Sequence, residues 1–183
     1  MKNVSAWSSA YATAGDMGIT IRPCSPADLE RLLPLLDEEF IFGKERSISL
    51  RLRFPTVLCH DNLHRILLCT DGEEIVAALA MRLFDWRDGR EIFRGAMIGA
   101  VYTQPARRGE GWASRLLEAA ATQLRDQGTD FGVLWTSQPA FYARLGWEAA
   151  DCSLLGEVEL DPFSPQSADN VTTLPAQDGT PLL

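Results

Sequence analysis

The sequence lacks the features that mark exported, membrane-spanning or metal-binding proteins. No apolar run approaches the roughly 20 residues that a membrane-spanning helix needs. The first 18 residues are mostly small and polar and contain no apolar segment of the kind that a signal peptide requires. We therefore expect a flexible lead-in over residues 1–17 and a cytoplasmic protein, since nothing in the chain predicts export.

Cysteine and histidine are scarce, and their spacing does not predict a metal site. The close set Cys59, His60 and His64 has no fourth ligand spaced nearby, whereas a structural zinc site uses four. We expect no metal. We also expect the cysteines to be reduced and mostly buried as small apolar residues. They are Cys24, Cys59, Cys69 and Cys152.

Basic residues are too few for a general nucleic-acid binder. Seventeen Lys and Arg against 25 Asp and Glu leave a net charge of −8, whereas phosphate contacts need a basic surface. An acidic surface can attract a cationic substrate such as an amine. The hydrophobic content of 46% in 183 residues allows one domain with a substantial core. We expect a small-molecule or peptide partner, and neither nucleic acid nor membrane.

The first half of the chain predicts a helix after a short strand, followed by a meander. Residues 19–22 form the strand pattern, and Ser25 followed by Pro26 is typical of a helix start. Leucines at helical spacing follow, although Pro34 should kink the helix or end it early. A second helix or loop leads to Pro55. Strand patterns over 65–69, 74–84 and 92–103, with turns at 71–72 and 86–90, then predict an antiparallel meander.

The second half predicts a βαβ unit. From Trp112 apolar residues recur at helical spacing, and Gly128 is a natural helix stop. A buried strand over 131–135 follows, so the crossover should be right-handed. A short helix over 139–145 and a strand from Trp147 complete the pattern. We expect an α/β (α+β) domain over 18–160, with a mixed sheet of six or seven strands flanked by helices, and a polar tail over 161–183.

The loop between the last meander strand and the long helix carries the chemistry. A glycine-containing turn that feeds a helix N-terminus presents unpaired backbone N–H groups and the positive end of the helix dipole to an anion. Gly109 and Gly111 allow the backbone to approach a ligand closely. Arg107 and Arg108 could add contacts to phosphate. Neither a P-loop nor a Rossmann fingerprint fits, and a solvated turn explains the same residues.

Two segments resemble the GNAT superfamily of acyl-CoA N-acyltransferases. Residues 108–113 (Arg-Gly-Glu-Gly-Trp-Ala) match its Gln/Arg-X-X-Gly-X-Gly/Ala signature, and residues 141–147 resemble its Phe-Tyr-X-X-X-Gly-aromatic segment. One helix and one strand separate them, as in that family, and the resemblance extends over about residues 19–160. It implies a GNAT fold and direct transfer of an acetyl group from acetyl-CoA to a primary amine. Val101-Tyr102-Thr103 with residues 134–137 is most similar to the enhanced-intracellular-survival-like branch.

The resemblance also implies roles for individual residues. Backbone groups of Val101 and Thr103 would pair with the pantetheine arm between two splayed strands, and backbone N–H groups over 108–114 would bind pyrophosphate. Tyr142 would protonate the leaving thiolate, although an aromatic packing role fits it too. The complete set of expected cofactor-binding residues is Val101, Tyr102, Thr103, Arg107, Arg108, Gly109, Gly111, Trp112, Ala113, Ser114 and Ser137.

The general base is not evident. Glu38, Glu39, Asp85 and Glu91 could border an acceptor site, but a solvated carboxylate explains each of them better when it is taken singly. We therefore expect a base that acts through water. Glu110 should repel pyrophosphate unless its side chain points outward, and Trp112 needs room in the first helical turn. Two alternatives therefore stay open: a non-catalytic acyl-CoA-binding regulatory module, and an interaction domain without cofactor. A homodimer is a further expectation, because exposed strand edges often pair.

Overall fold

The computed structural model describes residues 18–44 and 47–150. The predicted lead-in, the tail and Cys152 lie outside these residues, as does the chain after Ala150. Residues 147–150 themselves form no strand. The chain divides into two compact units, one ending at Ser137 and the other beginning at Gln138, and each is described by itself. Among the described residues, no helix has the length and apolar character to cross a membrane.

The first unit is built on a mixed five-stranded sheet in the order β1-β2-β3-β4-β5. Strands β1 to β4 are antiparallel neighbours, as the meander pattern predicts, and β5 runs parallel to β4. The α/β class is confirmed, with five strands in the described part of the chain instead of six or seven. The strands are β1 Ile19–Pro23, β2 Ile66–Asp71, β3 Glu74–Asp88, β4 Glu91–Thr103 and β5 Phe131–Val133.

Strands β3 and β5 differ most from the sequence prediction. Strand β3 continues to Asp88, because Trp86 pairs with Phe93 across the ladder, and the turn shrinks to two residues. Gly89 in that turn has φ 57°, the positive value that tight hairpin turns favour. Strand β5 is three residues long and half-buried rather than a buried strand over 131–135, and Trp135 is 72% exposed.

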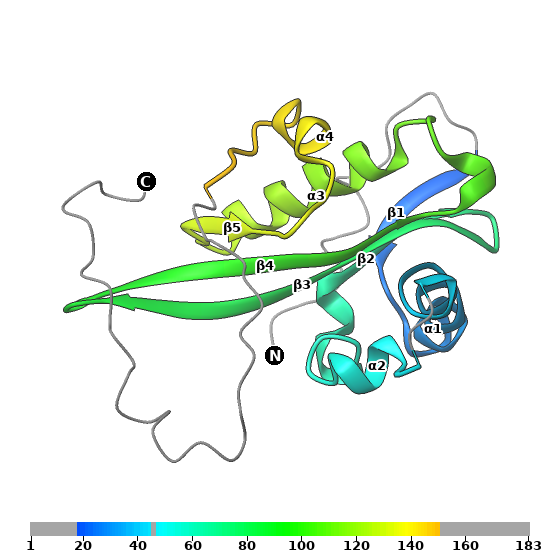
Figure 1. The fold of residues 1–183 in the computed structure, drawn as a ribbon, viewed down its shortest axis with the longest axis horizontal. Helices are drawn as coiled ribbons and strands as arrows, with labels where there is room; N and C mark the ends of the chain where they lie inside the picture. The colour runs from blue at the N-terminus through cyan, green and yellow to red at the C-terminus, as the bar shows by residue number, and fades with distance from the viewer. Residues whose placement is uncertain (1–17, 45–46, 151–183) are drawn as a thin grey trace, which may run out of the picture. The chain divides into compact units, whose positions relative to one another are not determined.

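The helices of this unit cover both faces of the sheet. Helices α1 Pro26–Phe40 and α2 Leu50–Arg53 lie on one face, and α3 Trp112–Asp126 lies on the other (Figure 1). Helix α3 has the predicted bounds, and Gly128 follows it with φ 70°. Helix α1 continues through Pro34 to Phe40, so the early end that Pro34 suggested does not occur. Pro34 itself is exposed, whereas Leu33 before it and Leu36 after it are buried, so packing outweighs the lost hydrogen bond. The 3-10 helices are η2 Phe42–Lys44, η3 His60–Arg65 and η4 Pro105–Arg107.

The start of α1 is fixed by a capping box that extends into an ion pair. Ser25 and Asp28 exchange the two reciprocal hydrogen bonds of the box. The Asp28 carboxylate also accepts from both terminal nitrogens of Arg22 in β1, at 2.6 and 3.0 Å. These contacts hold the pKa of Asp28 well below its ordinary value, the hydrogen bond from Arg22 being the main cause. They join β1 to α1.

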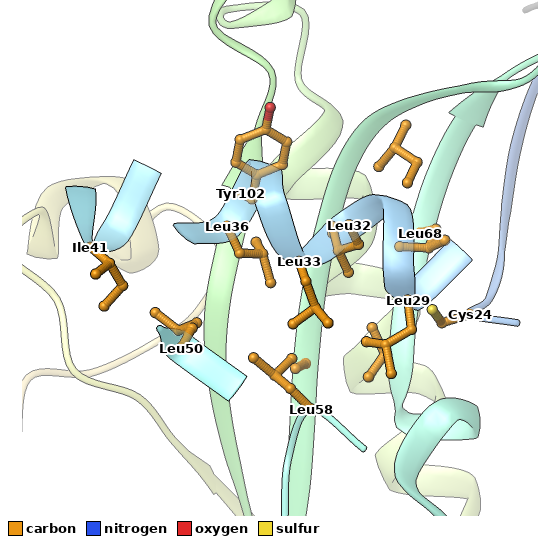
Figure 2. Close-up of a cluster of buried hydrophobic side chains, with 14 residues drawn as sticks. Cys24, Leu29, Leu32, Leu33, Leu36, Ile41, Leu50, Leu58, Leu68 and Tyr102 are labelled. Atoms are coloured by element: carbon orange, nitrogen blue, oxygen red, sulfur yellow. The ribbon is translucent and has the colours of Figure 1, made fainter. Parts of the chain in front are cut away.

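Two apolar layers hold the sheet between the helices. Leu29, Leu32 and Leu36 of α1 are at most 1% exposed and pack with Leu68 of β2 and with Tyr102 of β4 (Figure 2). On the other side, buried residues of α3 face the alternate side chains of the sheet. The buried α3 residues in this second layer are Leu116, Leu117, Ala120 and Leu124. Because one layer includes β4 and the other includes α3, the loop that joins them is anchored at both ends.

Candidate active site

Strand β4 has a free edge along its second half. It pairs with β5 only from Gly95 to Met97, opposite Phe131 to Val133. Beyond Met97 the strand continues to Thr103, with no partner strand on that side among the described residues. Pairing between these two strands therefore stops at Met97. This leaves six residues of β4, about 20 Å of strand, able to pair with an extended ligand.

A bulge interrupts β4 within this free edge. The register passes from Ala80 opposite Gly99 to Ala78 opposite Tyr102, so β4 contains one extra residue. Ala100 takes up the distortion with φ 50°, a value that residues other than glycine rarely adopt. Such bulges redirect side chains and are frequent beside active sites. Here Tyr102 turns toward α1, where its ring lies beside Leu36 with the hydroxyl pointing away from the leucines (Figure 2).

The loop after β4 opens onto the N-terminus of α3. Gly109 and Gly111 both have φ 86°, and a Cβ on either would meet no atom within 4 Å. Gly111 is the N-cap residue and supplies no side chain to the first helical turn. The N–H groups of that turn therefore have no side-chain cap. Together with the helix dipole, they form an exposed site suited to an anion.

Both arginines of the loop bind carboxylates of the protein. Arg107 donates through Nε to Glu110 at 3.0 and 3.1 Å, and through a terminal nitrogen to Asp71 of β2 at 3.3 Å. Arg108 donates to Glu39 of α1 at 2.7 Å and to the carbonyl oxygen of Thr103 at 3.2 Å. The sequence does not reveal these partnerships, because Asp71 and Glu39 lie 36 and 69 residues away.

Glu110 and Trp112, the two loop residues that depart from the expected pattern, contact each other. The Trp112 indole donates through Nε1 to Glu110 Oε2 at 2.7 Å, and Trp112 is only 5% exposed. The guanidinium of Arg115 lies over its ring, 4.5 Å from the centroid, and that of Arg107 lies 5.9 Å away. The Glu110 carboxylate is thus bound by two neighbours in the loop, and 42% of its side chain is exposed.

The remaining predicted cofactor residues lie along β4 and α3. Val101 and Thr103 are half-buried on β4, whereas Tyr102 is 4% exposed within the α1 core, and burial raises its pKa. Ala113 and Ser114 are half-buried in the first turn of α3. The exposed Ser137 is the last residue of the first unit.

Tyr142 lies in the second unit, on the short helix α4 Pro139–Ala143. Its ring makes edge contacts with Phe141 and Trp147, at centroid distances of 4.9 and 6.4 Å. The backbone N–H of Trp147 donates to the Tyr142 carbonyl, and that of Gly146 donates to the Ala143 carbonyl. These two hydrogen bonds end the helix. Burial raises the pKa of Tyr142, so its phenol stays protonated at neutral pH. The chemistry suits a proton donor, and the role stays a prediction.

The four candidate bases, Glu38, Glu39, Asp85 and Glu91, lie in different environments. Glu39 is bound by Arg108, and Asp85 lies opposite Arg94 in the β3–β4 ladder. Glu38 and Glu91 are exposed. Within residues 18–44 and 47–150, no three His, Cys, Asp or Glu side chains gather to hold a metal.

A cavity of about 270 Å³ lies on the α1 side of the sheet. Sequence reasoning missed it because its walls come from α1, β3 and the end of β4, which share no local pattern. It is lined by Arg31, Leu35, Glu74, Ile75, Tyr102 and Gln104.

Comparison with known proteins identifies the family. The acetyltransferase (GNAT) domain family matches residues 20–150. No curated protein matches the sequence. A predicted acetyltransferase with acetyl-CoA from Clostridium acetobutylicum is similar in structure at 17% identity and TM-score 0.62, covering 76% of this chain and 96% of its own.

Two further solved structures have the same fold. A transcriptional regulator from Bacillus halodurans C-125 is 24% identical with TM-score 0.61, covering 76% of this chain and 99% of its own. Glucosamine-6-phosphate N-acetyltransferase from Arabidopsis thaliana is 14% identical with TM-score 0.55, covering 77% and 99%. The family match extends from β1 through the β4–α3 loop to the end of the described residues, so the chain belongs to the GNAT acetyltransferase domain family.

Proposed function

We propose that the protein transfers an acetyl group from acetyl-CoA directly to a primary amine of a small molecule or peptide. The observation that carries this proposal is the continuity of two binding features. The free edge of β4 ends at Thr103, and the uncapped N-terminus of α3 begins eight residues later at Gly111. A ligand with an extended, amide-containing arm joined to a pyrophosphate could bind both features at once. The arm would pair with the strand edge, and the pyrophosphate would lie at the helix N-terminus.

The chain's residues fit such a cofactor at both ends. Backbone groups of Val101 and Thr103 would pair with the pantetheine amides along the free edge of β4. The N–H groups that follow Gly109 and Gly111 would bind the pyrophosphate, since no Cβ obstructs the approach. Bound acetyl-CoA would supply an acetyl group activated as a thioester.

Tyr142 is the proposed proton donor to the leaving sulfur. Its raised pKa keeps a proton on Oη near neutral pH, and an aromatic cluster fixes its ring. No carboxylate lies on β4 between Gly95 and Val101. A base acting through water would therefore deprotonate the incoming ammonium.

The test supplies acetyl-CoA with a panel of primary amines and measures thiol release. We expect turnover with at least one amine, and we expect Tyr142→Phe to lower kcat about 100-fold with little change in KM for acetyl-CoA. Thermal unfolding of the variant serves as the folding control. Full activity of Tyr142→Phe would remove the assigned acid.

One observation favours a second function, a non-catalytic acyl-CoA-binding regulatory module. Glu39, a candidate base, is bound to Arg108, and β4 carries no carboxylate between Gly95 and Val101 that could replace it. Binding of CoA without turnover across the amine panel would support this alternative. The absence of CoA binding would instead favour an interaction domain.

Several finer expectations from the sequence stay proposals. A place in the enhanced-intracellular-survival-like branch rests on residues 101–103 and 134–137, and a domain over 18–160 rests on the extent of the resemblance. A cytoplasmic location and a homodimer are likewise proposals. Sedimentation of the full chain would test the last of these.

A further inference from the structure

The carboxylate of Glu110 is bound from both sides of the glycine turn. Arg107, which precedes Gly109, donates to both of its oxygens at 3.0 and 3.1 Å. Trp112, which follows Gly111, donates to Oε2 at 2.7 Å. One carboxylate thus joins the residues immediately outside the turn, and glycine turns have the greatest conformational freedom to restrict.

The same carboxylate forms part of a longer connection to the sheet. Arg107 also donates to Asp71 at the end of β2, at 3.3 Å. The guanidinium therefore meets two carboxylates and lies within 6 Å of the Trp112 ring centroid. Its charge is already matched by protein groups before any ligand arrives. Arg108 is matched in the same way by Glu39.

We propose that Glu110 is a positioning residue for the cofactor, and that Arg107 is its partner in a clamp instead of a phosphate ligand. The clamp keeps Gly109 and Gly111 in the conformation that opens the first turn of α3. The pyrophosphate is then bound by main-chain N–H groups, and the arginine charge is used inside the protein. This inference rests on the proposed use of an acyl-CoA.

The two roles for Arg107 predict opposite results for Glu110→Gln. If Arg107 binds phosphate, removing the competing carboxylate charge releases it, and CoA binds more tightly. If the clamp positions the loop, the same change loosens the turn, and CoA binds more weakly. We expect the Kd for CoA, measured by calorimetry on the full chain, to rise about tenfold, because a charged hydrogen bond is lost.

Two further variants separate positioning from charge. Arg107→Lys keeps the positive charge but lacks the planar guanidinium that reaches Glu110 through Nε and Asp71 through a terminal nitrogen, so we expect it to weaken CoA binding to a similar extent. Glu118→Gln makes the same charge change at an exposed position of α3, and we expect an unchanged Kd. Thermal unfolding of each variant checks that the domain is folded.

A ligand without the pyrophosphate distinguishes the loop from the rest of the site. We expect Glu110→Gln to raise KM for acetyl-CoA and leave KM for acetyl-pantetheine unchanged, with kcat preserved in both cases. Tighter or unchanged CoA binding by Glu110→Gln overturns the clamp while the wild type still binds CoA. If the wild type binds no CoA, the proposed function fails, and this inference fails with it.

Discussion

Replacing Gly111 by alanine tests whether the uncapped N–H groups at the start of α3 bind the cofactor. Gly111 has φ 86°, and a Cβ there would meet no atom within 4 Å, so the substitution adds strain without a clash. The left-handed region costs an L-residue about 1–2 kcal/mol. The alanine also restricts the unfolded chain, which offsets roughly 0.4–1 kcal/mol. We therefore expect Gly111→Ala to lower the free energy of unfolding by about 1 kcal/mol.

The effect of Gly111→Ala on cofactor binding should exceed its effect on stability. In the free protein the loop can relieve its strain by turning the N–H groups away from the ligand. Binding would then have to restore the strained conformation, at a cost of about 1–2 kcal/mol, so the Kd for CoA should rise about 5- to 30-fold. Calorimetric titration with CoA measures this change.

Gly128→Ala is the matched control for Gly111→Ala. Gly128 follows the other end of α3 with φ 70°, and its Cβ would also meet no atom within 4 Å. We expect a similar loss of stability, a decrease in Tm of about 2–4 °C for a chain of this size, and no change in the Kd for CoA. If both variants lose CoA affinity equally, or if neither loses any, the start of α3 is not the binding site.

Further predictions concern the stability of the sheet and of α1. Asp28→Asn should lower the free energy of unfolding at pH 7 by about 2 kcal/mol, a value reduced because Arg22 is partly exposed to solvent. Because the folded-state pKa of Asp28 lies below its unfolded value near 4, wild-type stability should decline as pH falls below about 4, and urea unfolding of Asp28→Asn should show a smaller decline. Gly95→Ala would place a Cβ against the Phe84 ring and 2.9 Å from Phe131, so it should destabilise by about 1–3 kcal/mol. Gly99→Ala, in open space on the same strand, should change the denaturation midpoint little, and equal losses would contradict this packing.

Local chemistry made much of the first unit predictable. The Ser25 cap, the helical spacing within α3 and the turn at Gly72 depend on residues a few positions apart, and the structure has each of them. The glycines at 109 and 111 likewise occupy left-handed conformations for which their residue type is suited. For the same reason, the family signature in this loop could be recognised directly from the residue order.

Longer-range packing corrected several local predictions. Pro34 did not end α1, because the buried leucines around it stabilise the helix against the sheet. The β3–β4 hairpin extended to Asp88, because cross-strand pairs such as Trp86 with Phe93 outweighed the turn-like composition. Strand β5 ended at Val133, where pairing with β4 stops.

The sequence by itself determined the antiparallel meander, the long helix and the glycine turn before that helix, since each follows from backbone preferences and periodicity. Only the tertiary structure decided which groups pair with the charged residues of that loop. It joined Arg107 to Asp71 and Arg108 to Glu39, so the arginines that suggested a phosphate site are bound to the protein. The physical reason is distance along the chain. Ion pairs between residues 36 and 69 positions apart depend on sheet register and helix packing, which no local pattern encodes.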